Sequence, residues 1–244
     1  MTSVAEFVRF EEMRNFKSVN EGMRESGSSG KSSQRLKRKV ILRVLPMPKP
    51  ASLRETSRLR LGVADHDRKL SRQAYAKAQF DEPWRYERVK GKLAVMAPAG
   101  PDHQDPNNRI RDYLGSYAIA HPQVVERVYS EAWIAIDDDT DRIVDIGVYL
   151  AAEGARPGPG RPPDIAFEIV SGGGADRKRD YVEKRAEYLS AGVKEYVIVD
   201  RFERRVTVLR RTRGRFVESH LERTATYTSP LLPGLQIPLA KVFA

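Results

Sequence analysis

The sequence predicts an α/β fold in which helices flank a central mixed β-sheet. Two observations support this prediction. From residue 70 onward, short strand-like apolar runs alternate with turns built from glycine, proline and acidic residues. A longer segment, residues 177–191, lies among these runs and is typical of a helix that ends at Gly192. Strands with a helix inserted among them indicate a layered α/β domain with a mixed sheet.

The elements follow one another along the chain. A short helix is expected at residues 70–79, and two strands joined by a Lys-Gly turn are expected within residues 86–96. Asp105 as N-cap and Pro106 in the first turn predict a second helix, which ends near residue 120. The remaining strands are expected at residues 124–129, 132–136, 143–150, 164–170, 195–200, 205–210 and 215–220.

The positive charge of the chain is concentrated near its beginning. The net charge is +10, yet residues 80–244 contain equal numbers of basic and acidic residues, so the excess lies in residues 1–79. We expect residues 1–69 to be a disordered basic segment, or the product of a start codon assigned too far upstream, and residues 70–244 to be the folded domain. The alternative is that the segment is a basic arm that binds nucleic acid through its phosphates.

Composition and motifs exclude several classes of function. The chain has no cysteine, which rules out disulfides, zinc-thiolate sites and thiol nucleophiles. Its four histidines lack metal-binding spacing, and no GxSxG, P-loop or dinucleotide motif occurs. We therefore exclude serine hydrolases, NTPases and dehydrogenases. No apolar run approaches the roughly 20 residues that span a bilayer, and no signal-peptide core is visible, so we expect a cytoplasmic protein without membrane contact.

Two acidic residues interrupt apolar strands. Asp145 lies in RIVDIGVYL, and Glu168 lies in DIAFEIVS on the next expected strand. A buried charge without a partner is costly, so each carboxylate is either at a strand edge, in an internal salt bridge, or at a functional site. If the two strands are neighbours, both carboxylates project from one end of the sheet. Two such oxygen ligands suit Mg²⁺.

The helix after Glu168 carries a column of polar residues. Asp180, Lys184 and Tyr188 are spaced i, i+4 and i+8, so they share one helix face. An exposed Asp–Lys pair is the common interpretation of this spacing. The helix follows Glu168 directly, however, and Lys184 could then orient the attacking water and balance charge on a phosphate.

Two further features carry weaker signals. Residues 137–141, DDDTD, lack the ligand spacing of a calcium loop, and we expect a solvated hairpin turn there. His103 lies in a PDHQ loop before the second helix. It is either an ordinary turn histidine or a residue that contacts a phosphate near the site.

These motifs together resemble a known family. The stretches YERVKGKLAVMAPAGPDH, RDYVEKRAEYLSAGVKEYVIVD and SPLLPGLQIPL, with Glu131, Asp145 and Glu168 in that order, resemble the Uma2 family. That family is a branch of the PD-(D/E)xK nuclease superfamily. The resemblance covers residues 70–244, and its most specific part runs from Glu168 to Asp200.

The resemblance implies a restriction-endonuclease-like fold and Mg²⁺-dependent hydrolysis of DNA. Asp145 and Glu168 match the metal ligands of the family. The usual lysine of the superfamily falls on Val170, and Lys184, preceded by Asp180, takes its place on the following helix. Two supporting positions of the family are matched by His103 and Glu131.

The leading hypothesis is therefore a divalent-metal endonuclease with Asp145, Glu168 and Lys184 as catalytic residues. The carbonyl of Ile169 would complete a site for Mg²⁺, with Mn²⁺ as the alternative ion. DNA is the expected substrate and RNA the alternative, and a homodimer is expected for an enzyme that cuts both strands. The rival hypothesis is a catalytically silent nucleic-acid-binding or interaction module with the same fold.

Overall fold

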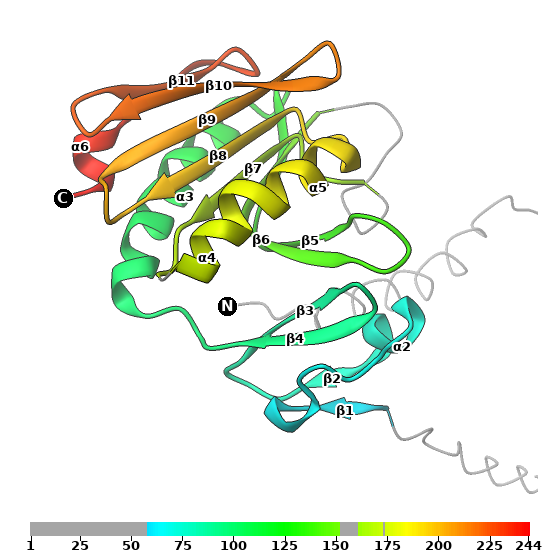
Figure 1. The fold of residues 1–244 in the computed structure, drawn as a ribbon. Helices are drawn as coiled ribbons and strands as arrows, with labels where there is room; N and C mark the ends of the chain where they lie inside the picture. The colour runs from blue at the N-terminus through cyan, green and yellow to red at the C-terminus, as the bar shows by residue number, and fades with distance from the viewer. Residues whose placement is uncertain (1–57, 152–160, 173) are drawn as a thin grey trace, which may run out of the picture. The chain divides into compact units, whose positions relative to one another are not determined.

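The structure, a computed structural model, describes residues 58–151, 161–172 and 174–244. Its main sheet has eight strands in the order β10-β9-β8-β7-β6-β3-β4, with β5 paired to β6 (Figure 1). Within this sheet, β7 and β8 are the one parallel pair and the other paired strands are antiparallel, which confirms the predicted mixed sheet. The strands are β3 (Arg85–Val89), β4 (Lys92–Met96), β5 (Val125–Ala135), β6 (Asp141–Leu150), β7 (Ile165–Ile169), β8 (Glu195–Asp200), β9 (Arg205–Thr212) and β10 (Arg215–Glu222).

Helices and two small sheets complete the described part of the chain. No helix there is long and apolar enough to cross a membrane. The short strands are β1 (Arg60–Leu61) with β2 (Gln79–Phe80), and β11 (Thr226–Ser229) with β12 (Leu232–Pro238). The helices are α2 (Arg72–Lys77), α3 (Pro101–Ala120), α4 (Gly174–Lys178), α5 (Lys184–Ala191) and α6 (Leu239–Val242). A π-helical turn, Arg179–Glu183, joins α4 to α5.

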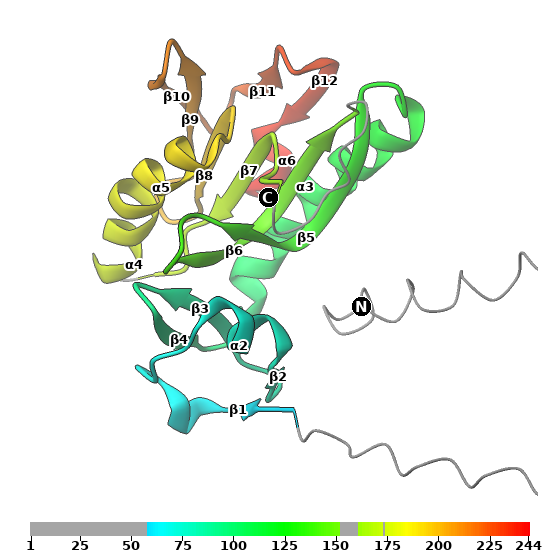
Figure 2. The ribbon, with the colours of Figure 1, turned by 90° about the vertical axis from the view of Figure 1, so that its right-hand side faces the viewer.

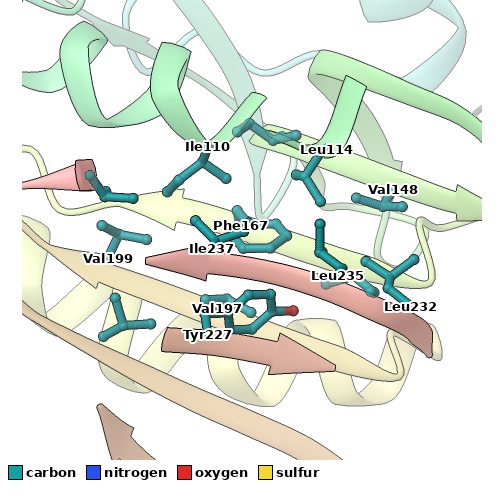
Figure 3. Packing of buried hydrophobic residues seen from close by; sticks show 14 of the residues in the cluster. Ile110, Leu114, Val148, Phe167, Val197, Val199, Tyr227, Leu232, Leu235 and Ile237 are labelled. Carbon is teal, nitrogen blue, oxygen red and sulfur yellow. The ribbon is translucent and has the colours of Figure 1, made fainter. Parts of the chain in front are cut away.

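The main sheet buries both of its faces. On one face, α3, α6 and the β11–β12 hairpin pack over a cluster that includes Phe167 and Val197 (Figure 3). On the opposite face, α5 packs over a cluster that includes Ala166 and Tyr188 (Figure 2). Because side chains alternate along a strand, Glu168 follows Ala166 and points towards α5. This alternation brings Glu168 to the helix that carries Lys184.

Strand β6 has different neighbours along its length. On one side it pairs with β5 along most of its length, and this pairing is interrupted between Glu131 and Asp145. On the other side, Asp141 pairs with Arg88 of β3, and residues 146–148 pair with β7. Asp145 therefore lies between the ends of two strands that share one edge of β6. The gap between these two strand ends leaves space beside the Asp145 carboxylate, which a continuous sheet would fill.

Helix α3 begins earlier than the sequence predicted. Its first residue is Pro101, preceded by the extended Gly100, and Pro106 lies inside the helix. A proline fits the first helical position because the missing N–H has no helical partner there, and two prolines of this sequence compete for that position. The expected start at Pro106 was wrong. His103 therefore lies in the first turn of α3 and not in a loop.

The acidic hairpin is only partly solvated. Residues 137–139 are exposed in the turn between β5 and β6, as expected. Asp141, however, is fully buried and binds Arg72, Arg88 and the Trp133 indole. The prediction of a solvated turn was wrong for Asp141, because three distant donors surround its carboxylate.

The folded unit begins before residue 70. Leu61 in β1 is fully buried and packs with Tyr75, Tyr86 and Leu93. The described residues 58–69 thus belong to the small layer formed by β1, β2, α2 and the β3–β4 hairpin. The expected disorder of the basic segment concerns mainly residues 1–57, which lie outside the described residues.

Candidate functional site

Charged side chains from separate elements converge on one small cavity of about 20 Å³. The elements are β3, β6, β7 and the helical segment of residues 174–191. The alternation of side chains along β7 places Glu168 at the cavity, and the gap beside β6 leaves room for Asp145 there. The helical segment contributes Lys184. The charged residues that line the cavity are Arg85, Glu87, Asp145, Glu168, Arg179, Asp180 and Lys184.

Asp145 is almost fully buried and surrounded by donors. The backbone N–H of Ile169 donates a hydrogen bond to Oδ2 (2.8 Å), and Nη2 of Arg85 lies 2.9 Å from Oδ1. Nε2 of His103 lies 3.3 Å from Oδ2, without the geometry of a regular hydrogen bond. Burial alone would raise the pKa of Asp145, but the His103 contact and the charge of Arg85 outweigh it and hold this pKa well below its usual range.

Glu168 is buried beside Lys184 and Tyr188. Nζ of Lys184 lies 2.9 Å from Oε1, and the Tyr188 hydroxyl donates to the same oxygen (2.5 Å). Burial raises the pKa of Glu168 to about 8, and the charges of Asp145 and Asp180 act in the same direction, against the opposing charge of Lys184.

Lys184 is shared between two carboxylates. Besides Glu168, its ammonium lies 3.3 Å from Oδ1 of Asp180, the residue one turn earlier. Burial would lower the pKa of Lys184, but the carboxylates around it, Glu168 first, raise the pKa above its ordinary value. The lysine is therefore a permanent cation, and it cannot act as a base near neutral pH.

The cavity holds more acidic than basic groups. Four carboxylates and three cations line it. Glu87 is matched by Arg142 outside the cavity at 2.9 Å, and the charges of Lys184 and Arg142 hold the pKa of Glu87 low in spite of burial. Asp180 has its pKa raised by burial, against the charges of Lys184 and Arg179. Its Oδ1 is buried without a hydrogen bond. With Glu87 matched by Arg142, the other three carboxylates of the cavity face three cations.

The structure brings most of the predicted site residues together. Asp145, Glu168, Ile169, Asp180 and Lys184 all line the cavity, and His103 contacts Asp145 from α3. Glu131 is more remote. Its side chain is 59% exposed and reaches the site only through Arg85, at 3.5 Å.

Three charged residues of the cavity were not predicted from the sequence: Arg85, Glu87 and Arg179. Arg85 and Glu87 both come from β3, nearly sixty residues before Asp145. Arginine and glutamate are common in short strands with one solvated face, so neither residue type stood out. The one available signal was the alternation of charges in RYERV, which lies within the stretch that resembles the family.

The donor set suits a hard divalent cation. Asp145 and Glu168 offer carboxylate oxygens to one cavity, and such oxygens are the protein ligands that Mg²⁺ and Mn²⁺ prefer. Among the described residues, no group of three acidic or histidine side chains is arranged as a complete metal cage.

Comparisons with known proteins concern the fold and the family of the chain. The fold recurs in a structure described as "Crystal structure of a putative nuclease belonging to DUF820 from Anabaena variabilis ATCC 29413". The TM-score is 0.58 and the identity 17%, over 71% of this chain and 97% of that chain. The family Uma2, described as "Putative restriction endonuclease", matches residues 72–240. The chain belongs to the Uma2 family, as the sequence indicated. No curated protein matches the chain.

Proposed function

We propose that the protein is a divalent-metal-dependent endonuclease that hydrolyses phosphodiester bonds in DNA. The observation that carries this proposal is the convergence of Asp145, Glu168 and Lys184 on one cavity at the gap between β3 and β7. Membership of a family described as "Putative restriction endonuclease" supports the same reaction class. In such reactions most of the catalysis comes from positioning and from stabilising charge on the phosphate.

Asp145 and Glu168 would hold the Mg²⁺ ion, with the carbonyl of Ile169 as a third protein ligand. The ion would acidify the attacking water and neutralise charge on the phosphate oxygens. The hydrogen bond from the Ile169 N–H orients Asp145, and the Tyr188 hydroxyl orients Glu168. Both carboxylates are thus fixed by groups of the scaffold, as a preorganised site requires.

Lys184 would stabilise the phosphate in the transition state. Its ammonium is held between Glu168 and Asp180, and both contacts keep it charged. Asp180 is a positioning residue, because it acts through the lysine. Lys184 directly follows the π-helical turn as its C-cap, and its backbone N–H donates to the carbonyl of Arg179. Such turns are frequently found at functional sites.

A second candidate function is a catalytically silent nucleic-acid-binding module. One observation favours it: Arg85 already neutralises Asp145 in the structure. The equal numbers of acidic and basic residues in 80–244 also favour it, since grooves that bind DNA are usually basic. The two candidates differ in whether the protein cleaves nucleic acid.

Cleavage of supercoiled plasmid in Mg²⁺ or Mn²⁺ tests the proposal. We expect nicking by the native protein and a loss of at least about a hundredfold in Asp145→Asn, Glu168→Gln and Lys184→Met, the scale of losing one electrostatic group from an active site. Asp105→Asn is a matched control, since Asp105 is exposed on α3. A single-stranded RNA substrate, tested in parallel, distinguishes RNA from DNA as the target.

Persistent nicking in all three site variants would contradict the site assignment. Binding of plasmid without cleavage, in either metal, would support the silent module. Circular dichroism of each variant must show the native fold, so that lost activity is not lost structure.

A further inference from the structure

Arg85 and Glu131 form a chain of contacts that ends on Asp145. Nη2 of Arg85 lies 2.9 Å from Oδ1 of Asp145, and its Nε lies 3.5 Å from Oε1 of Glu131. The three residues come from β3, β5 and β6. Neither Arg85 nor Glu131 has a role in the proposed reaction so far.

Three protein groups surround the Asp145 carboxylate. Two of them are fixed in place, because the Ile169 N–H belongs to the buried strand β7 and His103 is buried in α3. Arg85 is different, since its side chain is long and 18% exposed. A divalent cation bound to Asp145 would also repel the guanidinium strongly at this distance. A cation that binds Asp145 must therefore displace Arg85.

Glu131 is placed to receive the displaced guanidinium. The register of β5 against β6 puts Glu131 opposite Asp145, and pairing is interrupted there because the backbone of Glu131 has a φ of 53°. This left-handed conformation is uncommon outside glycine, and such residues cluster at ligand sites and switch regions. Nε of Arg85 is buried without a hydrogen bond. A small rotation towards Glu131 would satisfy it.

We propose that Arg85 is a positioning residue that neutralises Asp145 in the metal-free protein and moves to Glu131 when a divalent cation binds. The inference rests on the proposed function, because it assumes that Asp145 is a metal ligand. It assigns to Arg85 the control of metal affinity at this site. The ion competes with an internal cation, and Glu131 lowers the free energy needed to release that cation.

If Arg85 competes with the metal ion, its removal should raise the metal affinity. If Arg85 only supports the fold, its removal should lower the metal affinity. Removing a competing cation weakens the metal-free protein, because Asp145 loses a buried partner, yet it tightens metal binding. Removing a residue that only supports the site weakens both. Metal affinity measured without nucleic acid therefore separates the two roles.

Calorimetric titration with MnCl₂ alone tests the proposal. We expect Arg85→Gln to bind Mn²⁺ about tenfold more tightly than the native protein, the scale of one charge-assisted hydrogen bond. Glu131→Gln should bind Mn²⁺ several-fold more weakly in the native background and unchanged in the Arg85→Gln background, since the two residues act as a pair. Arg127→Gln is the matched control for Arg85→Gln, because Arg127 carries the same charge as Arg85 and is exposed on the strand that holds Glu131.

Thermal unfolding gives a second readout. Arg85→Gln should melt at a lower temperature than the native protein without Mn²⁺ and show a larger upward shift when Mn²⁺ is added. Arg85→Lys, which retains the charge with a less suitable geometry, should give an intermediate affinity, and it replaces Arg85→Gln should that variant fail to fold.

Equal or weaker Mn²⁺ binding by Arg85→Gln and Arg85→Lys would overturn the role of Arg85. An undiminished effect of Glu131→Gln in the Arg85→Gln background would overturn the role of Glu131. If neither the native protein nor any Arg85 variant binds Mn²⁺, the proposed metal site fails together with this inference. Binding that is lost in Asp145→Asn, but is indifferent to Arg85, overturns the inference alone.

Discussion

Two buried glutamates of neighbouring strands show what separates a candidate site from ordinary structure. Glu168 and Glu195 are both buried, and each is bound by a tyrosine hydroxyl and a cation. Glu195 accepts bonds from Tyr227, Ser229 and Arg210, so both of its oxygens have partners. Glu168 shares its cation with a second carboxylate and lines a cavity with a third.

The difference shows that a charge buried in a strand is not by itself a mark of function. Glu195 is a closed ion pair that joins β8, β9 and the β11–β12 hairpin. Glu168 lines a cavity together with other carboxylates, and its burial there, assisted by the charges of Asp145 and Asp180, raises its pKa to about 8. A strongly raised carboxyl pKa beside a cavity is the signal that points to a ligand.

The largest contrast is expected in stability. Glu195→Gln should lower the free energy of unfolding at neutral pH by about 2 kcal/mol, because it leaves the partly buried Arg210 without its counter-ion. Glu168→Gln should cost less, because the folded protein already favours an uncharged side chain at this position and Asp180 remains beside Lys184. Urea unfolding followed by circular dichroism measures both. Equal losses in the two variants would contradict the comparison.

Stability should also depend on pH through Glu168. Its pKa is about 8 in the folded protein and close to its ordinary value of 4.5 in the unfolded chain. Between these values the folded state binds more protons, so the free energy of unfolding falls as the pH rises through this window. The pKa values of Asp145 and Glu87 are lowered in the folded protein, so these two groups change the free energy of unfolding at pH values below this window. Unfolding measured across the window should show a slope that Glu168→Gln flattens and Glu195→Gln leaves in place.

The smallest expected contrast concerns the two tyrosines. Tyr227→Phe should cost about 1.5 kcal/mol, because it removes a hydrogen bond to a charged carboxylate. Tyr188→Phe should cost less at neutral pH and should raise the pKa of Glu168 further, since the Tyr188 hydroxyl lowers that pKa. In the same pH series, the range over which the free energy of unfolding falls should extend to higher pH in Tyr188→Phe than in the native protein. An unmoved end would show that Tyr188 does not act on Glu168.

Much of this fold was predictable because local patterns govern it. The strands around Asp145 and Glu168 are apolar runs with turn residues on either side, and Gly192 ends α5 in a left-handed conformation (φ 99°). The spacing of Asp180, Lys184 and Tyr188 put all three on the face that meets Glu168. The prediction failed where two local patterns compete, as it did for the start of α3 with its two prolines. The β11–β12 hairpin was not anticipated.

Contacts between remote segments were not predictable in this way. Arg85 reaches Asp145 from a hairpin that local sequence places correctly but cannot orient. Asp141 was grouped with the exposed acidic turn because its buried partner Arg88 lies more than fifty residues away. Likewise, Glu131 has an ordinary sequence context, and only the backbone reveals its conformation. Contacts between remote segments set the surroundings of these residues, and the periodicity of the sequence does not reveal such contacts.

The most direct test of the central claim is a crystal structure of the protein with Mn²⁺. We expect an anomalous-difference peak in the cavity, from an ion bound by carboxylate oxygens of Asp145 and Glu168 at about 2.1 Å, the distance typical of Mg²⁺-type sites. Crystals of Asp145→Asn should lack the peak. A Mn²⁺-soaked crystal without density between these carboxylates, or with the ion held only by the exposed turn of residues 137–139, would contradict the account.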